Sequence, residues 1–206
     1  SLVGSEMCIR DSVNDGSTDG TSETLRRLSL PKNVKLVEYK VNRGKGYAVR
    51  VGIKNSNGKC VIVQDADLEY DPSEIEKLLK VMKKSKVEAV YGSRFLGKVS
   101  GMKLPFKIGN MFITLVTNFL FHSRLSDVET CYKLVRGDIV KTLKLRMNRF
   151  EIEVEITAKL LKQGYRIIEV PITYKARSKK EGKKIKWVDG IKAIVVPLLI
   201  KFNLLK

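Results

Sequence analysis

Two aspartates follow directly on a short apolar stretch, and their spacing suits metal chemistry. The stretch occupies residues 60–64, and Asp65-Ala66-Asp67 comes next. Because side chains alternate faces along an extended strand, Asp65 and Asp67 are expected to project the same way. Two carboxylates about 4 Å apart repel each other by roughly 4 kcal/mol at an effective dielectric constant near 20. A divalent cation removes that cost, and Mg²⁺ or Mn²⁺ accepts carboxylate and phosphate oxygens.

The same pair has a plainer interpretation, an acidic turn ahead of a helix. Asp71 and Pro72 are typical of a helix start, since Asp caps the first turn and Pro fits its opening position. On this stretch alone, a metal-diphosphate site and an acidic turn both remain open.

Two further polar turns contain residues suited to binding a nucleotide or an anion. Residues 14–21 read NDGSTDGT, where Asp15 can accept hydrogen bonds from a base or ribose and glycine lets a ligand approach. Residues 42–46 read NRGKG, where Gly44 and Lys45 at a helix start suit an anion. Neither turn is a Walker loop or a GxGxxG fingerprint. Taken alone, residues 14–21 are better explained by an ordinary capped turn, and residues 42–46 fit a glycine-rich turn as well as an anion site.

Alternating strands and helices must position these turns. Strands are expected at residues 34–39, 60–64, 87–91 and 165–170, helices at 22–28, 47–54, 71–84, 106–121, 150–163 and 187–205, and a loop at 97–101. This order predicts an α/β fold, with a mainly parallel sheet flanked by helices on both faces. Ligands in such folds bind at the carboxyl ends of the strands, where the three polar turns lie.

The two ends of the chain carry distinct expectations. Residues 1–12 form a poor strand, so we expect a non-native segment there and a first strand that is missing or replaced. Residues 13–186 are expected to form one domain, including a basic and mobile segment at 176–186. Residues 187–206 are expected to form an amphipathic helix that is suited to a membrane interface.

Composition limits the class of partner. The chain has 206 residues, 43% of them apolar, and a formal charge of +18, which favours anionic partners such as phosphorylated substrates, anionic lipids or nucleic acid. Its three cysteines form no CxxC pair, so a reduced, cytosol-facing location is expected. No run of about 18 apolar residues occurs, so no membrane-spanning helix is predicted. The basic residues 177–186 include no aromatic side chain, which argues against nucleic-acid binding.

The three polar turns occur in one order, each at a strand end, and together they resemble the family 2 glycosyltransferases with the GT-A (Rossmann-like) fold. The likeness is greatest to the polyprenyl-phosphate branch, which includes the dolichyl-phosphate mannose synthases. It extends from residue 13 to residue 206. Further matching segments are YGSRF at 91–95, SDVETCYK at 126–133, EVPI at 169–172, YKAR at 174–177 and EGKK at 181–184.

The resemblance implies a donor site built from these turns. Asp15 would contact the nucleotide base or ribose, and Gly44 with Lys45 would lie beside the donor. The DxD-type element Asp65-Ala66-Asp67 would hold the metal, Mg²⁺ or Mn²⁺, that bridges the donor diphosphate. Glu69 would lie close to the metal, at a position where relatives often carry glutamine.

The resemblance also implies an acceptor side. Arg94 would meet the acceptor phosphate or the donor diphosphate, and Arg177 and Lys184 would close over phosphate groups. Asp127 would occupy the acidic position on the acceptor side, which makes it the leading candidate for a catalytic base. Glu129 would orient the acceptor as an alternative. A helix cap or an ion pair with Arg124 or Lys133 also explains the two acids.

The implied activity is transfer of a hexose from a nucleotide sugar of the GDP-mannose or UDP-glucose type to a dolichyl or undecaprenyl phosphate, with inversion. The enzyme would work peripherally at the cytoplasmic face of a membrane, with the apolar segments 106–121 and 191–205 at the interface. Core packing or an oligomer contact explains the same apolar segments. A basic nucleic-acid-binding protein and a catalytically impaired nucleotide-sugar-binding domain are the alternatives. The sugar, the lipid and the oligomeric state are left open.

Overall fold

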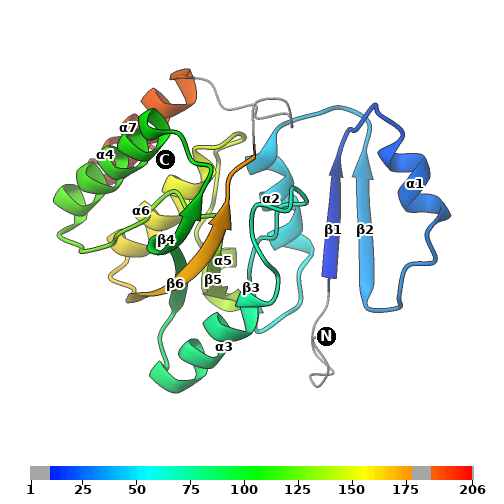
Figure 1. The fold of residues 1–206 in the computed structure, drawn as a ribbon, viewed down its shortest axis with the longest axis horizontal. Coiled ribbons are helices and arrows are strands. Elements are labelled where there is room, and N and C mark those ends of the chain that lie inside the picture. The colour runs from blue at the N-terminus through cyan, green and yellow to red at the C-terminus, as the bar shows by residue number, and fades with distance from the viewer. Residues whose placement is uncertain (1–9, 178–186, 206) are drawn as a thin grey trace.

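The fold is described by a computed structural model covering residues 10–177 and 187–205. Strands and helices alternate through most of the chain (Figure 1). The elements in order are β1 Arg10–Asp15, α1 Thr21–Arg27, β2 Val34–Tyr39, α2 Lys45–Asn55, β3 Cys60–Val61, α3 Glu74–Ser85, β4 Ala89–Ser100, α4 Leu104–Phe121, β5 Lys133–Arg136, α5 Gly137–Thr142, α6 Ile152–Lys162, β6 Ile167–Lys175 and α7 Trp187–Lys201.

The strands form two groups. β1 and β2 pair in parallel, and a second sheet has the order β3-β5-β4-β6. β4 and β6 are parallel, whereas β5 runs antiparallel to both of its neighbours. Figure 1 shows the two groups with α2 between them in this view. The predicted α/β architecture with parallel strands is confirmed, and the antiparallel β5 is a feature that the alternating pattern did not predict.

The second sheet is covered on both faces. Successive side chains of a strand point to opposite faces, so each face has apolar side chains that pack against helices. On one face Ala89, Tyr91 and Val135 pack against the buried side chains of α2, α5 and α6. On the other face Val90 and Leu134 pack against Leu78 and Met82 of α3, together with a group of tyrosines. Burial on both faces explains the short apolar runs where the central strands pair, Ala89–Tyr91 in β4 and Leu134–Val135 in β5.

Three expectations about strands need correction. Residues 10–12 do form a strand, because β1 pairs with β2 from Arg10 onward, so the first strand is present. Regular strand pairing in β3 ends at Val61 rather than residue 64.

Residues 97–100 belong to β4 rather than to a loop. β4 and β6 resume their pairing at Lys98 after a register shift. A β-carbon on Gly97 would lie 1.9 Å from the carbonyl oxygen of Ile172, so only glycine permits this approach. The glycine that indicated a loop therefore marks a strand irregularity.

Two helices carry an exposed apolar surface, here called the α4/α7 face. On α4, six large apolar side chains are between 51% and 80% exposed: Leu104, Ile108, Met111, Phe112, Leu115 and Phe119. Ile191 and Val195 of α7 are also exposed, and the two helices pack together. By length and composition α4 is able to cross a membrane, which corrects the expectation of no such helix. The predicted segment 176–186 lies outside the described residues from residue 178 onward.

Candidate active site

Asp15, at the end of β1, holds the glycine-rich turn that precedes α2. Its two carboxylate oxygens accept hydrogen bonds from the backbone N–H groups of Arg43 and Gly44, both at 2.8 Å. The amide of Asn42 donates to the backbone carbonyl of Asp15 at 2.9 Å. Two turns that are about thirty residues apart in sequence are thereby joined at the carboxyl ends of neighbouring strands, as expected for one ligand site.

The glycine-rich turn also fits closely against a distant segment, residues 147–149. Gly44 has a φ of 98°, which favours glycine. A β-carbon on Gly44 would lie 2.5 Å from the carbonyl oxygen of Asn148, and one on Gly46 would lie 2.5 Å from that of Met147. The turn therefore needs glycine because another part of the backbone occupies the space beside it.

Lys45 connects the turn to the predicted metal site. Its Nζ lies 2.7 Å from Oδ2 of Asp65 and 3.0 Å from Oε1 of Glu153. The other oxygen of Glu153 lies 2.7 Å from Nζ of Lys133. Burial opposes ionisation of Glu153, but Lys133 and Lys45 hold its pKa below its ordinary value. The result is a continuous chain of charges from Asp65 into the core.

Sequence reasoning missed Glu153 as part of the site. The sequence did contain a signal, because Glu153 lies within an apolar helix and an acid buried there requires a partner. In the structure Glu153 is only 5% exposed. The sequence offered Lys133 as an ion-pair partner for the acids before it, and the structure pairs it with Glu153 instead.

Asp67 and Glu69 meet the guanidinium of Arg177. Nη2 of Arg177 lies 2.7 Å from Oδ2 of Asp67, and its Nε lies 3.5 Å from Oε1 of Glu69. The backbone N–H of Arg177 and the hydroxyl of Tyr174 also donate to Glu69, at 2.8 and 2.9 Å. Asp67 lies in a turn beyond β3, so strand alternation does not set its direction. The turn bends at Leu68, whose φ of 58° is unusual for a residue other than glycine.

These carboxylates have the donor chemistry that Mg²⁺ and Mn²⁺ require. Burial raises the pKa of Asp67, and repulsion from Asp65 and Glu69 acts in the same direction, so a nearby cation favours the ionised form. Within the described residues no three acidic, histidine or cysteine side chains are arranged to hold a metal by themselves. Magnesium commonly takes one or two carboxylates and completes its shell with phosphate and water, so the residues fit a metal that arrives with a diphosphate.

Arg94 and Asp127 form a buried pair. Nε and Nη2 of Arg94 donate to the two oxygens of Asp127 at 2.7 and 2.8 Å, and the backbone N–H of Arg94 donates at 3.0 Å. The Asp127 side chain is fully buried and that of Arg94 is 7% exposed. Since both oxygens of Asp127 are occupied, its geometry favours a role in positioning Arg94 over the predicted role of a base.

Glu129 is an acid with spare hydrogen-bonding capacity. Its Oε1 is buried and has no hydrogen-bond partner. Burial raises the pKa of Glu129 to about 7, even though Lys133 and Arg94 oppose the shift. A carboxylate with an open oxygen and a pKa near neutrality suits proton transfer.

The raised pKa of Glu129 predicts how stability changes with pH. The folded state holds this proton up to about pH 7, whereas the unfolded chain loses it near 4.3. Ionisation of Glu129 therefore costs folding free energy as the pH rises through this window. We expect Glu129→Gln to be more stable than the parent at pH 8, by about 2 kcal/mol after allowance for partial exposure, and similar to it at pH 4.

Urea unfolding of both proteins at the two pH values measures this difference. The exposed Glu23 of α1 supplies the control, because Glu23→Gln makes the same chemical change at the surface. An equal gain at pH 4 and pH 8 would show that ionisation of Glu129 is not responsible.

The structure thus brings most of the predicted site residues into contact with one another, and one predicted residue is not among those that it describes. Ala66 is exposed between the two aspartates. Lys184 lies outside the described residues. The remaining predicted residues fall into the three contacting groups above, centred on Asp15, on the DxD-type element and on the Arg94–Asp127 pair, with Glu129 within electrostatic reach of Arg94 and Asp127.

Comparisons with known proteins agree with this geometry. Residues 12–143 match the family model described as glycosyl transferase family 2. A dolichol-phosphate mannosyltransferase of Pyrococcus furiosus is 30% identical over 176 residues, covering 83% of this chain and 49% of the relative. An uncharacterised protein of Methanocaldococcus jannaschii is 29% identical over 169 residues, covering 76% of this chain and 72% of the relative. The chain thus spans about half the length of the Pyrococcus enzyme.

Solved structures share the fold at lower identity. The glucosyl-3-phosphoglycerate synthase of Mycobacterium tuberculosis, in complex with Mn²⁺, UDP and glucosyl-3-phosphoglycerate, aligns with a TM-score of 0.64 at 14% identity, covering 94% of this chain and 68% of the other. TarS of S. aureus, in complex with UDP-GlcNAc, aligns with a TM-score of 0.60 at 16% identity, covering 92% and 57%. These likenesses establish the GT-A fold. The chain belongs to glycosyl transferase family 2 and is a glycosyltransferase with the GT-A fold.

Proposed function

We propose that this enzyme transfers a hexose from a nucleotide sugar to a polyprenyl phosphate, with a divalent cation at the donor diphosphate. The observation that carries the proposal is the pairing of Asp65 with Lys45 and of Asp67 with Arg177 at the end of β3. Two carboxylates and two cations from three separate elements provide ligands for a metal and counter-charges for phosphates. The sequence identity between this chain and the Pyrococcus mannosyltransferase supports the use of the same kind of sugar donor by both proteins.

The residues divide the work on the donor. Asp15 holds the backbone of the glycine-rich turn, and the start of α2 favours an anion beside it. Asp65, Asp67 and Glu69 would hold Mg²⁺ or Mn²⁺, which supplies Lewis-acid stabilisation of the leaving diphosphate. Lys45 and Arg177 add positive charge where the negative charge of the leaving group develops.

A groove between β4 and α4 supports an amphipathic acceptor. It has a volume of about 600 Å³, and its polar lining includes Arg94, Lys107 and Ser126. Its apolar lining includes Phe95, Met111 and Leu115. A lipid phosphate has matching chemistry, an anion that suits a guanidinium and a hydrocarbon chain that suits the apolar wall. Because a phosphate is already ionised at neutral pH, its attack on the sugar needs no base. In the proposed in-line displacement an acceptor phosphate oxygen bonds to the anomeric carbon as the bond from that carbon to the donor diphosphate breaks, which releases the nucleoside diphosphate and inverts the carbon.

The α4/α7 face supports work at the surface of a membrane. Its exposed apolar side chains continue from the groove through Met111 and Leu115. Lys103, Lys107 and Lys192 are exposed on the same helices or at their ends. Basic residues near anionic lipid contribute about 1 kcal/mol each, and apolar side chains add to that attraction. We propose on this basis that the enzyme works at the surface of a membrane.

A transfer assay tests the proposal. The purified protein is incubated with radiolabelled GDP-mannose or UDP-glucose, Mg²⁺ or Mn²⁺, and dolichyl or undecaprenyl phosphate. Label is expected to enter the organic phase with at least one donor and to remain in the aqueous phase when the lipid is the unphosphorylated alcohol. Label that never enters the organic phase with any of these donor and lipid pairs would contradict a lipid-phosphate acceptor.

A second function is favoured by Glu129. Its open oxygen and its pKa of about 7 suit the removal of a proton from a hydroxyl acceptor, which a phosphate acceptor would not require. The synthase from Mycobacterium tuberculosis, which shares the fold, is solved with glucosyl-3-phosphoglycerate. Transfer to 3-phosphoglycerate or another soluble alcohol, lost in Glu129→Gln, would favour this candidate over the lipid phosphate.

A further inference from the structure

A basic hollow lies at the opposite end of β3 from the DxD-type element. Its volume is about 510 Å³, and its lining comes from the start of β3, the end of α3 and the junction of β5 with α5. None of its lining residues belongs to the candidate active site. No lining residue comes from α4 or α7, so the hollow is not part of the α4/α7 face. In Figure 1, α3 lies at the lower edge of the molecule, whereas α4 and α7 lie at the upper left.

Four cations line the hollow: Lys59, Lys83, Lys86 and Arg136. The acid in the lining, Asp138, is engaged by Arg136 through two hydrogen bonds at 2.6 and 3.2 Å, and Glu88 also lies within electrostatic reach of Arg136. In the part of the chain that the structure describes, the three lysines form no ion pair, whereas Lys77 and Lys80, earlier on α3, pair with Glu74 and Glu76. Three lysines without an ion pair therefore line one concave surface.

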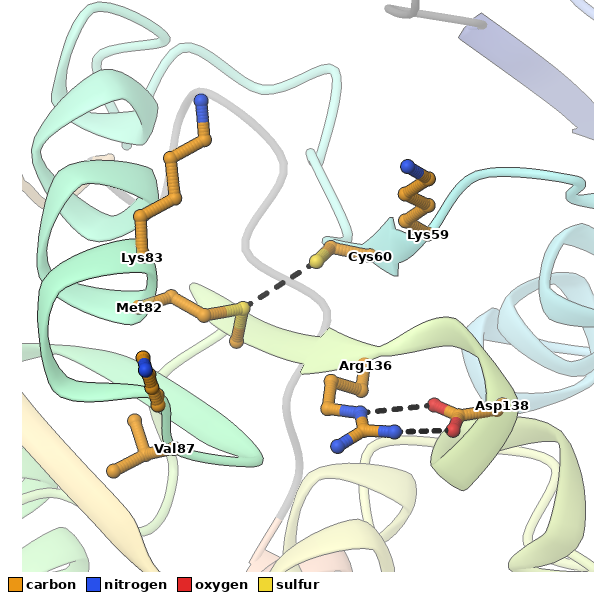
Figure 2. A pocket seen from close by; sticks show the side chains of 8 residues that line it. Lys59, Cys60, Met82, Lys83, Val87, Arg136 and Asp138 are labelled. Atoms are coloured by element: carbon orange, nitrogen blue, oxygen red, sulfur yellow. Dashed lines mark hydrogen bonds and ion pairs between the residues drawn. The ribbon is translucent and has the colours of Figure 1, made fainter.

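The helix dipole explains only part of this arrangement. Cations at the last turn of a helix interact favourably with its carbonyl groups, which accounts for Lys83 and Lys86 at the end of α3. Lys59 precedes β3, so interaction with a helix dipole does not account for its position. Figure 2 shows Lys59 and Lys83 on either side of Cys60, with the Arg136–Asp138 pair below them. Charges from different elements that gather around a hollow repel each other unless an anion lies between them.

The remaining lining is apolar and suits more than a bare ion. Cys60, Met82 and Val87 contribute to it, and the sulfur atoms of Cys60 and Met82 lie 3.4 Å apart. The volume falls within the range of small-molecule sites. Lysine ammonium groups bind phosphate as point charges, without the planar geometry that a guanidinium needs.

We propose that this hollow binds a soluble ligand that carries a diphosphate or several phosphates, at a site separate from the donor site. Lys59, Lys83 and Lys86 hold the phosphates, and the apolar lining contacts the rest of the molecule. Arg136 contributes positive charge and is kept in place by Asp138. The site is independent of the sugar donor and of the acceptor.

Titration with inorganic pyrophosphate tests the proposal. The measurements are isothermal calorimetry and amide chemical shifts of the full chain, in the presence of a chelator so that no metal-diphosphate complex forms. The shift changes are expected at residues 59–60, 83–87 and 136. Lys59→Gln with Lys83→Gln is expected to weaken binding by about tenfold or more.

A matched control separates a site from general charge attraction. Lys54→Gln with Lys84→Gln removes the same charge from neighbouring positions that do not line the hollow, and it is expected to change the affinity by less than about twofold. Equal losses in the two variants would overturn the proposal. So would shift changes confined to residues 44–46 and 65–67.

Vesicles of an anionic phospholipid separate a soluble ligand from a lipid headgroup. The Lys59 and Lys83 variant is expected to bind these vesicles as well as the control variant does. Loss of vesicle binding in the first variant alone would overturn the assignment of a soluble ligand.

Discussion

Asp67→Asn is expected to lower the rate of glycosyl transfer by about a hundredfold or more. The substitution removes one of the carboxylates available to a divalent cation and leaves a neutral amide, which binds such cations less strongly. Loss of one electrostatic group that stabilises developing charge typically costs two to three orders of magnitude in rate. The Asp67 side chain also holds Arg177 at 2.7 Å, so the second phosphate-directed cation loses its anchor.

The measurement is single-turnover transfer from the donor identified by the assay, together with Mn²⁺ binding followed by electron paramagnetic resonance. Asp71→Asn makes the same chemical change at an exposed residue in the turn before α3, and it is expected to leave both quantities almost unchanged. Transfer that persists in Asp67→Asn and also in the presence of a chelator would exclude the metal mechanism.

Asp127→Asn is expected to destabilise the protein by about 3–5 kcal/mol, the cost of breaking a buried ion pair by removing one partner. Asp127 is fully buried and accepts three hydrogen bonds from Arg94, so its neutral replacement leaves a guanidinium inside the protein without a counter-charge. The aromatic rings of Phe95 and Tyr174 lie 5.6 and 5.2 Å from that guanidinium and stabilise the cation only in part.

The chain contains a matched pair for comparison. Arg136 and Asp138 form the same two-hydrogen-bond arrangement, but their side chains are 50% and 63% exposed. Asp138→Asn is therefore expected to change the stability of the protein very little, because water already solvates both charges. Urea unfolding of the two variants measures the loss of stability that the same Asp-to-Asn change causes in a buried pair and in an exposed pair. Similar losses in both would contradict the assignment of Arg94 and Asp127 as a buried structural pair.

This stability cost affects how activity data should be interpreted. A slow Asp127→Asn enzyme does not identify Asp127 as a base, since loss of the pair would also move Arg94 in the acceptor groove. The double variant Arg94→Met with Asp127→Leu removes both charges and is expected to recover part of the lost stability.

Local patterns in the sequence predicted the elements and the polar turns. The apolar run before Asp65 and the helix signals at Asp71 and Pro72 depend on neighbouring residues, and such signals can be followed along the chain. The helix expected at 106–121 is α4, Leu104–Phe121. The order of the turns predicted that Asp15 and Gly44 would belong to one ligand site, but it did not predict the hydrogen bond between them.

Contacts between distant residues were not predictable in this way. Lys45 and Glu153 are more than a hundred residues apart, and their ion pair depends on how α6 packs against α2. β5 is antiparallel because the chain returns after α4, which no local pattern encodes. The strand at residues 10–12 is formed by pairing with β2, which overrides the weak strand preference of Arg-Asp-Ser.

The close fit of the glycine-rich turn against residues 147–149 limits how this enzyme can change its donor preference. Any side chain at Gly44 or Gly46 would collide with backbone carbonyl groups, whatever nucleotide sugar is bound. These two positions are therefore expected to stay glycine in any library selected for a new donor. Adaptation must instead proceed through positions whose side chains face open space, and a screen of variants can leave the turn untouched.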